Sequence, residues 1–283
     1  MALDQLEAGE EQSPQEEEKE MSFLEHLEEL RWHLIRAALS IVVLAIAIFI
    51  AKDFVWGTIL LAPSRVDFWT YEMLCRAGEY LNSQGLCIDE LPFKLQSRKM
   101  TGQFTVHLTS SFVLGLIVAF PYVFWEIWRF VSPGMKSNER NNSSGAVFYV
   151  SLLFSLGVLF GYFILAPLSI NFLSHYNVDP SIVNEFELTN YISTISMIVL
   201  ACAVLFQLPM IVFFLTKAGL ITPEFMRSYR KHALIAILIL GAFLTPPDPV
   251  SQVLIAIPLF GLYQVSIYIS ALTIKRSKVE ETI

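Results

Sequence analysis

The segment just before the first long apolar stretch carries side chains suited to binding a cation. It reads Met-Ser-Phe-Leu-Glu-His-Leu-Glu-Glu-Leu-Arg-Trp-His-Leu, and Ser22 and Glu25 have the spacing of a capping box at a helix start. In a helix, Glu25, Glu29 and His33 would line up on one face, and apolar residues would form a separate stripe. The pattern predicts an amphipathic helix that lies along the cytoplasmic membrane surface. Glu29 would then be either a ligand-binding carboxylate or a solvated partner of His33 or Arg36.

No other motif in the chain points to catalysis or to a metal site. The sequence lacks a phosphate-binding loop, a glycine-rich dinucleotide turn, a His-Glu-x-x-His motif and a Cys-x-x-Cys pair. His26 and Glu29 are three residues apart, but two ligands do not make a metal site. Ser228 and Lys231 have Ser-x-x-Lys spacing without the companion motifs of that enzyme class. We therefore expect that the protein is not an enzyme and that it binds no cofactor or metal.

Composition places the chain in the membrane. Of its 283 residues 54% are hydrophobic and only 16% are charged, with a mean hydropathy of +0.55. The net charge of −7 comes from the N-terminal tail, because eight acidic residues and one lysine precede Met21. We predict that residues 1–21 form an acidic, disordered tail. Acidic and basic residues balance in the rest of the chain, which removes the electrostatic argument for nucleic-acid binding.

Six apolar stretches predict an all-α integral membrane protein with six transmembrane helices. Together with the amphipathic segment they would form one membrane domain over residues 22–274, followed by a cytoplasmic tail over residues 275–283. The predicted spans are residues 34–54, 106–128, 146–173, 191–215, 231–244 and 250–272.

The last two spans are expected to be short and to form a hairpin. The apolar run Ala233–Leu244 has 12 residues, roughly 18 Å of helix, which is less than the thickness of a bilayer core. Pro246, Pro247 and Pro249 prevent it from continuing into the next span, so a tight turn must join the two. Prolines recur within or at the ends of several spans, which predicts bent helices and a concave body. These are Pro121, Pro167, Pro209 and Pro258.

The distribution of Lys and Arg predicts that both termini are cytoplasmic. Alternate connections are rich in bases, whereas the 173–190 loop and the 245–249 turn contain none. The long first loop, residues 52–103, carries six bases, but six acids match them there. Its length and balance weaken its influence on orientation.

Several blocks, in the same order along the chain, resemble the TatC family, the membrane receptor subunit of the twin-arginine protein translocase. They cover most of residues 22–272. The blocks are His26-Leu-Glu-Glu-Leu-Arg31, Phe130-Val-Ser-Pro133-Gly-Met-Lys-Ser-Asn-Glu139-Arg140, Phe163-Ile-Leu-Ala-Pro167-Leu, Phe206-Gln207-Leu-Pro209, Gly219-Leu-Ile-Thr-Pro-Glu and Leu244-Thr-Pro-Pro-Asp248-Pro-Val-Ser-Gln252.

The resemblance implies a receptor in the bacterial inner membrane that binds the Arg-Arg motif of signal peptides at its cytoplasmic face. It also implies that the receptor recruits a small single-span TatA-type partner, with a TatB-type partner where one exists, within a complex that contains further copies of the chain. A transmembrane proton gradient would supply the energy. In such a receptor the two arginines meet two carboxylates, which here are Glu29 and Glu139.

The chemistry of these side chains fits that role. Guanidinium presents a planar fork of donors to a carboxylate, so bidentate pairing favours Arg over Lys. Two separated carboxylates could therefore bind two arginines as a geometric pair. From the residues alone, Glu139 would instead be a solvated partner of Arg140. The resemblance adds a further group of residues to the expected signal-peptide site: His26, Arg31, Phe130, Pro133 and Arg140.

Inside the membrane the chain departs from the family pattern. Gln207 and Gln264 stand where the family often has glutamates. A neutral Gln still donates and accepts hydrogen bonds, so both residues could contact a partner, but a proton relay through them is not expected. The alternative is a hydrogen bond between helices, which we favour for Gln264 and weigh equally for Gln207, beside Pro209. Gly157 and Gly161 either offer a small-residue face for close helix packing or are glycines that a membrane helix simply tolerates, and we weigh the two equally. We assign structural roles to Pro63, Pro167 and Asp248.

Two of the three cysteines, Cys75 and Cys87, lie in the long first loop on the predicted oxidising side of the membrane. We favour a disulfide between them over two free thiols. Cys202 falls in the middle of a span and is expected to be a packing residue.

A secondary transporter of a small solute is the alternative class of protein, since such proteins are also polytopic with broken helices. The absence of a clear inverted repeat in the sequence argues against it.

Overall fold

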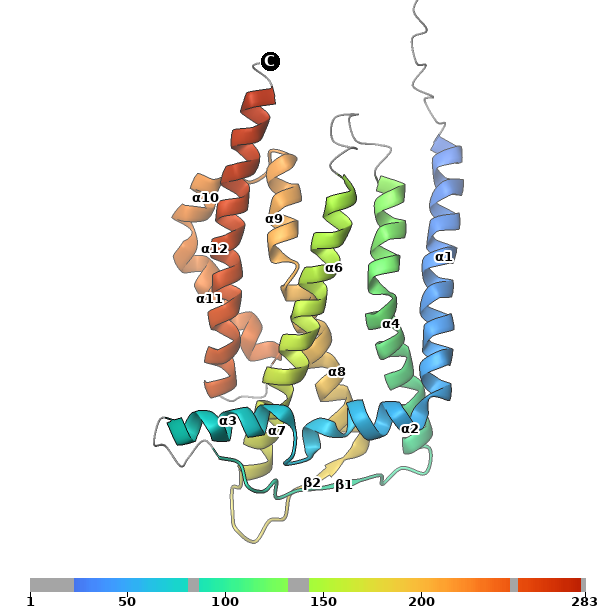
Figure 1. Cartoon of the computed structure of the whole chain (residues 1–283), viewed down its shortest axis with the longest axis vertical. Helices are drawn as coiled ribbons and strands as arrows, with labels where there is room; N and C mark the ends of the chain where they lie inside the picture. Colours follow the sequence, from blue (N-terminus) through green and yellow to red (C-terminus); the bar gives the residue numbers. More distant parts are fainter. Residues whose placement is uncertain (1–22, 81–86, 132–142, 245–248, 281–283) are drawn as a thin grey trace, which may run out of the picture.

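The computed structural model of the chain describes residues 23–80, 87–131, 143–244 and 249–280. These form a bundle of upright helices closed at one end by shorter elements that lie across it (Figure 1). The upright helices are α1 (Phe23–Ile50), α4 (Gly102–Val131), α6 (Ser143–Phe160), α7 (Ala166–His175), α8 (Leu188–Leu205), α9 (Leu208–Lys217), α11 (Arg230–Leu244) and α12 (Pro249–Glu280).

Within the described residues, five helical segments are long and apolar enough to cross a bilayer. They are Glu28–Ile50, Gly102–Val131, Gly145–His175, Leu188–Lys217 and Gln252–Lys275. Their outer faces expose large apolar side chains such as Leu39 and Val43, which suits contact with lipid rather than water.

The final pair of helices differs in length. α11 has 15 residues, about 22 Å of helix, so it is short as expected. The expectation that α12 is also short is wrong, because α12 runs for 32 residues and Pro258 does not end it. The side chain of Gln252 donates to the Leu238 carbonyl at 3.2 Å and ties the two helices together.

The expectation that the amphipathic segment forms a separate surface helix is also wrong. Residues Phe23–Ile50 form one helix, and α1 stands upright over its whole length (Figure 1). No Gly or Pro interrupts this stretch, so nothing breaks the run of backbone hydrogen bonds between the polar and apolar parts. Glu29 therefore projects from the end of the first span, not from a helix lying flat on the bilayer.

Two spans are broken at prolines. In the third, a π-helical turn at Gly161–Leu165 separates α6 from α7, which has Pro167 in its first turn. In the fourth, α8 ends at Leu205 and α9 starts at Leu208, with Pro209 in its first turn. Proline has no backbone N–H, so a helix restarts more easily at a proline than it continues through one.

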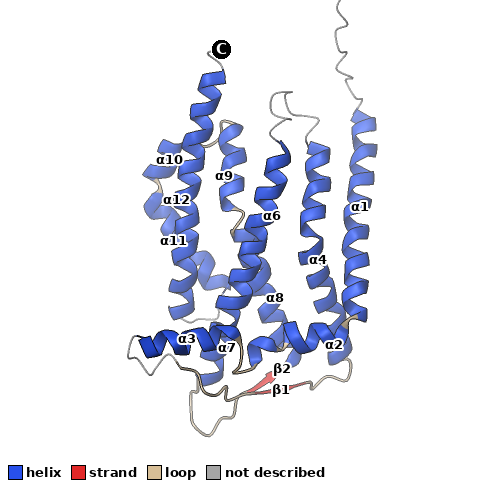
Figure 2. Cartoon of the chain, in the orientation of Figure 1, coloured by secondary structure: helices blue, strands red, loops and turns tan. Residues whose placement is uncertain are grey.

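The end of the bundle opposite the start of α1 is covered by the long first loop and the 173–190 loop (Figure 2). Its short helical elements are α2 (Lys52–Phe54), a π-helical turn (Val55–Leu60), a 3₁₀ turn (Ala62–Ser64) and α3 (Trp69–Tyr80). At the other end, α10 (Pro223–Ser228) precedes α11.

The two covering loops are joined by a small sheet, which corrects the expectation of an all-α fold. Strand β1 (Lys94–Gln96) pairs in parallel with β2 (Glu185–Glu187), and Lys94 lies opposite Glu185. Arg98 also forms a 3.0 Å ion pair with Glu185. A base of the first loop is thus neutralised by an acid of the second loop, which has no Lys or Arg of its own.

Close packing between spans three and four depends on two glycines. A Cβ on Gly157 would lie 2.7 Å from both Ala203 Cα and the Cys202 carbonyl oxygen, and a Cβ on Gly161 would lie 2.9 Å from Val199 Cα. The predicted small-residue face, at the end of α6 and the start of the π-helical turn, therefore packs against α8. The core continues through Leu165, which is fully buried.

Candidate functional site

The predicted signal-peptide residues that the structure describes lie at the end of the bundle where α1 begins and α4 ends. Glu29 and His33 are four residues apart on α1, and Glu126 and Phe130 are four residues apart on α4. This spacing places each pair on one helix face, one turn apart. The His33 and Phe130 rings lie 6.3 Å apart between centroids, so the two faces meet.

A buried polar cluster connects these faces. The Nδ1 atom of His33 lies 2.5 Å from Oε2 of Glu126, and the Tyr122 hydroxyl donates to Oε1 of Glu126 at 2.7 Å. His33 is 7% exposed and Glu126 is 1% exposed. Each carboxylate oxygen of Glu126 therefore has a hydrogen-bond partner, one on α1 and one on α4.

Sequence reasoning missed Glu126 and assigned His33 to a solvated face. The interpretation of Glu29 as a partner of His33 does not hold, because His33 is turned inward to Glu126. One signal was present in the sequence: a glutamate inside an apolar run long enough to cross a bilayer needs a partner. Which partner it takes depends on how α1 packs on α4, and no local pattern encodes that.

The remaining predicted recognition residues are placed as follows. Glu29 is half-buried on α1, and Arg31 is exposed, with its guanidinium carbon 5.9 Å from the centroid of the Trp32 ring. His26 lies in the first turns of α1. The predictions for Pro133, Glu139, Arg140 and Asp248 fall outside the described residues.

Gln207 and Pro209 lie at the break in span four. The Gln207 side chain donates from Nε2 to the Val150 carbonyl at 3.1 Å, which joins α9's start to α6. Its Oε1 atom is buried without a hydrogen-bond partner in the described part of the chain. Gln264 is half-buried on α12, where the neighbouring Tyr263 donates its hydroxyl to the Met226 carbonyl at 2.8 Å.

The two structural prolines meet at the opposite end of the bundle. The Tyr71 hydroxyl lies 3.1 Å from the Pro63 carbonyl and 2.9 Å from the Pro167 carbonyl, so α3 is tied to both. Burial and the neighbouring Tyr191 raise the pKa of Tyr71 well above its usual range. Also in this region, Cys75 and Cys87 are joined in a disulfide.

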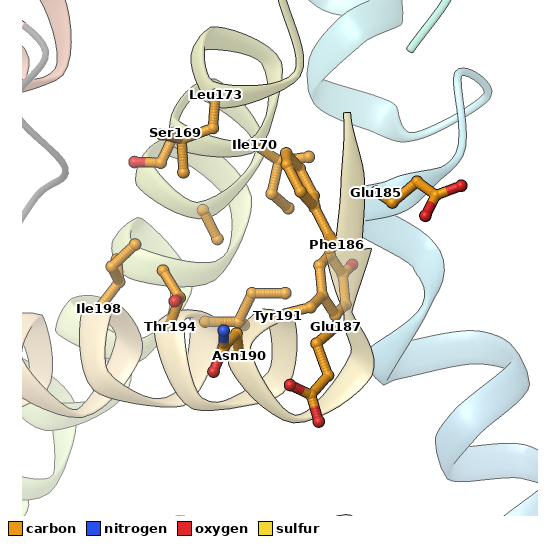
Figure 3. Close-up of a pocket in the computed structure, with 12 residues that line it drawn as sticks. Ser169, Ile170, Leu173, Glu185, Phe186, Glu187, Asn190, Tyr191, Thr194 and Ile198 are labelled. Atoms are coloured by element: carbon orange, nitrogen blue, oxygen red, sulfur yellow. The ribbon is translucent and has the colours of Figure 1, made fainter. Parts of the chain in front are cut away.

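A cavity of about 180 Å³ lies between α7, β2 and α8, also at the end far from Glu29 (Figure 3). Ser169, Asn190 and Thr194 line it among apolar side chains, and the buried Ser169 hydroxyl has no partner in the described residues. Of the residues expected to bind a signal peptide, those that the structure describes do not line this cavity.

Apolar helices long enough to cross a bilayer define the class: this is a polytopic α-helical membrane protein. Residues 25–258 match the family described as Sec-independent protein translocase protein (TatC), and the chain belongs to that family. The resemblance stated from the sequence is therefore confirmed, and the protein is a component of a protein translocase.

Relatives and solved structures agree with this assignment. The chain is 39% identical over 256 residues to the TatC protein of Blattabacterium sp. subsp. Periplaneta americana, covering 90% of this chain and 96% of the relative. It is 33% identical over 259 residues to that of Halalkalibacterium halodurans, covering 92% of each. A crystal structure described as the twin arginine translocase receptor TatC superposes with a TM-score of 0.62 at 30% identity, covering 88% of this chain and 99% of that one.

Proposed function

We propose that this chain is the signal-peptide receptor of its translocase, and that Glu29 and Glu139 bind the two arginines of the Arg-Arg motif. The observation that carries the proposal is the meeting of the Glu29 face of α1 with the Phe130 face of α4. The segment that contains Glu139 follows directly after Val131, the last residue of α4. A peptide seated at this end would therefore contact α1 and the end of α4.

The charge and shape of this surface suit an arginine pair. Glu29 is half-buried, so part of its hydration is already lost and an arriving guanidinium would form a stronger charge-assisted hydrogen bond than at a fully solvated site. The fork of guanidinium donors matches a carboxylate in a way that ammonium does not. Phe130 supplies an apolar ring at the same end of the bundle as Glu29, where the hydrophobic part of a signal peptide could lie.

We further propose six spans with both termini in the cytoplasm and a hairpin that joins the short α11 to the longer α12. The start of α1 and the end of α12 lie at the same end of the bundle (Figure 1), and this end carries Arg129, Lys217, Arg230 and Lys275. An excess of Lys and Arg favours the cytoplasmic side. At the other end, two bases of the first loop pair with acids, Arg76 with Glu72 and Arg98 with Glu185.

The proposed partners are a TatA-type single-span protein, a TatB-type protein where one exists, and further copies of this chain, assembled in the bacterial inner membrane. Family membership supports this proposal, since the family is a translocase component. The large apolar faces that the single chain exposes could accept neighbouring helices as well as lipid.

The test is photo-crosslinking of a signal peptide, carrying a photoreactive residue beside its Arg-Arg motif, to the chain in native membranes. Glu29→Ala and Glu139→Ala should each reduce crosslinking about tenfold or more, because a hydrogen bond to a charged group contributes about 1.5–3 kcal/mol. Exchange of both peptide arginines for lysine should have a similar effect.

Glu28→Ala is the matched control, because Glu28 is the exposed neighbour of Glu29 and carries the same charge. It should leave crosslinking unchanged. Equal crosslinking in Glu29→Ala, Glu139→Ala and Glu28→Ala, with normal membrane insertion, would contradict the assigned roles. Uptake of a radiolabelled solute by liposomes that contain only this chain would instead favour the transporter alternative.

A further inference from the structure

Two polar residues that no signal-peptide role requires are buried directly below the proposed site. Glu126 and His33 face each other from α4 and α1 at 2.5 Å, and Tyr122 holds the second carboxylate oxygen at 2.7 Å. A buried carboxylate is costly and is retained only where its partners compensate for lost hydration. A pair of leucines of similar size would pack these helices without that cost, so the pair calls for an explanation beyond stability.

The register of the two helices supplies that explanation. α1 and α4 run antiparallel (Figure 1), and a second close approach occurs where a Cβ on Gly115 would lie 2.8 Å from the Ala45 backbone nitrogen. In this register, the residue one turn before His33 on α1 lies opposite the residue one turn after Glu126 on α4. Those positions are Glu29 and Phe130, the two described walls of the proposed site.

We infer that His33 and Glu126 are positioning residues for diarginine recognition: their pairing fixes the separation and rotation of α1 and α4 and so sets where Glu29 stands relative to Phe130. The inference rests on the proposed function and adds two residues to it. Neither residue touches the peptide, since both are almost fully buried. Each acts through the carboxylate or ring one turn away on its own helix.

The geometry explains why a polar pair serves this purpose better than apolar packing. Leucine side chains can slide past one another at little cost, whereas a hydrogen bond weakens steeply with distance and angle. The His33–Glu126 contact and the Gly115–Ala45 contact are separated by 11 residues on α4 and 12 on α1, which is about 16–18 Å at 1.5 Å per residue. Two fixed points this far apart prevent both rolling and splaying of α1.

The decisive variant is the double substitution His33→Leu with Glu126→Leu. Replacing both members of a buried pair by apolar residues is often neutral or stabilising, so this variant should fold and keep its thermal stability. It should nevertheless bind an Arg-Arg signal peptide about tenfold more weakly, because small displacements of binding groups are enough to lose affinity. Glu126→Gln keeps hydrogen-bonding capacity toward both neighbours and should retain most of the binding.

The helix positions are measured separately with spin labels on Leu30→Cys and Val131→Cys, at exposed positions at the facing ends of α1 and α4. Cys75 and Cys87 are bridged and Cys202 is buried, so only the introduced thiols take the label. We expect a single narrow distance in the otherwise unaltered chain and in Glu126→Gln. The double leucine variant should give a broadened or shifted distribution.

Each outcome bears on one proposal. A folded double leucine variant that binds the peptide as tightly as the unaltered chain, or one with an unchanged label distance, overturns the positioning role. Failure of the unaltered chain to bind the Arg-Arg peptide overturns the proposed function and the recognition part of this inference, while the label distances still decide whether the pair fixes the helices. Weaker binding together with lost thermal stability in every variant, Glu126→Gln included, would assign the pair to stability and overturn the positioning role.

Discussion

The contact between spans three and four should weaken when a single methyl group is added at Gly157. In Gly157→Ala the new Cβ would lie 2.7 Å from Ala203 Cα and 2.7 Å from the Cys202 carbonyl oxygen, and both are backbone atoms that no rotamer change can move. Favourable carbon contacts lie at about 3.5–4.0 Å, so α6 and α8 must separate by roughly 1 Å. Overpacking of this kind costs about 1–3 kcal/mol.

Gly261→Ala is the matched control, because nothing lies within 4 Å of a Cβ at that exposed position on α12. It makes the same chemical change in a helix and should be neutral or slightly stabilising, since Ala is the better helix former. Any difference between the two variants therefore reports the α6–α8 contact and not helix propensity.

Thermal unfolding in detergent can be followed with a thiol-reactive dye. Cys202 is 1% exposed and is the free cysteine, so the dye reacts when α8 leaves its neighbours. At about 2–4 °C per kcal/mol, the Tm of Gly157→Ala should fall by roughly 2–12 °C. Equal Tm values for Gly157→Ala and Gly261→Ala would refute the reasoning that backbone contact at Gly157 limits the helix separation.

Two further predictions concern the opposite end of the bundle. Tyr71→Phe should cost about 1 kcal/mol, because the Pro63 and Pro167 carbonyls lose a buried donor. Because the pKa of Tyr71 is raised in the folded chain, the contribution of its hydroxyl to folding stability is fully present below about pH 10, the ordinary tyrosine pKa. This contribution is lost as the pH rises further. Tyr71→Phe should therefore reduce the alkaline loss of stability, measured as Tm against pH. Mass mapping of protein isolated without reductant should recover a peptide that joins Cys75 to Cys87. Reduction of this disulfide should lower the free energy of unfolding by up to about 3 kcal/mol. Free, alkylatable thiols at both positions would contradict the bridge.

Much of the helical framework could be predicted from local patterns. Apolar runs of sufficient length indicate helices because a bilayer leaves no other way to satisfy the backbone, so α4 and α11 begin and end near predicted spans, and α12 begins near one but runs past its predicted end. Pro209 marked the break in the fourth span because it lacks an N–H donor. Gly157 and Gly161 marked the contact face because only glycine allows backbones to approach so closely.

Other features depended on neighbours that lie far away in the sequence. Amphipathicity predicted a separate surface helix, but these residues form the first turns of α1, because a polar stripe does not by itself end a helix. The β1–β2 pair joins segments about 90 residues apart, and each strand has only three residues, too few for an alternating pattern to stand out. Gln207 could be identified as polar and intramembrane, but its acceptor, the Val150 carbonyl, became known only from packing.

The sequence by itself determined the membrane class and the family, and it showed the acidic side chains that we propose to bind arginines, because hydropathy, proline positions and residue order can be read along the chain. Only the tertiary structure decided that His33 turns away from Glu29 and pairs with Glu126, 93 residues later. The physical reason is that a buried charge is stabilised by whichever partner the packing of helices brings within hydrogen-bond distance. The candidate site therefore combines residues that could be identified in the sequence with the His33–Glu126 contact, which depends on helix packing.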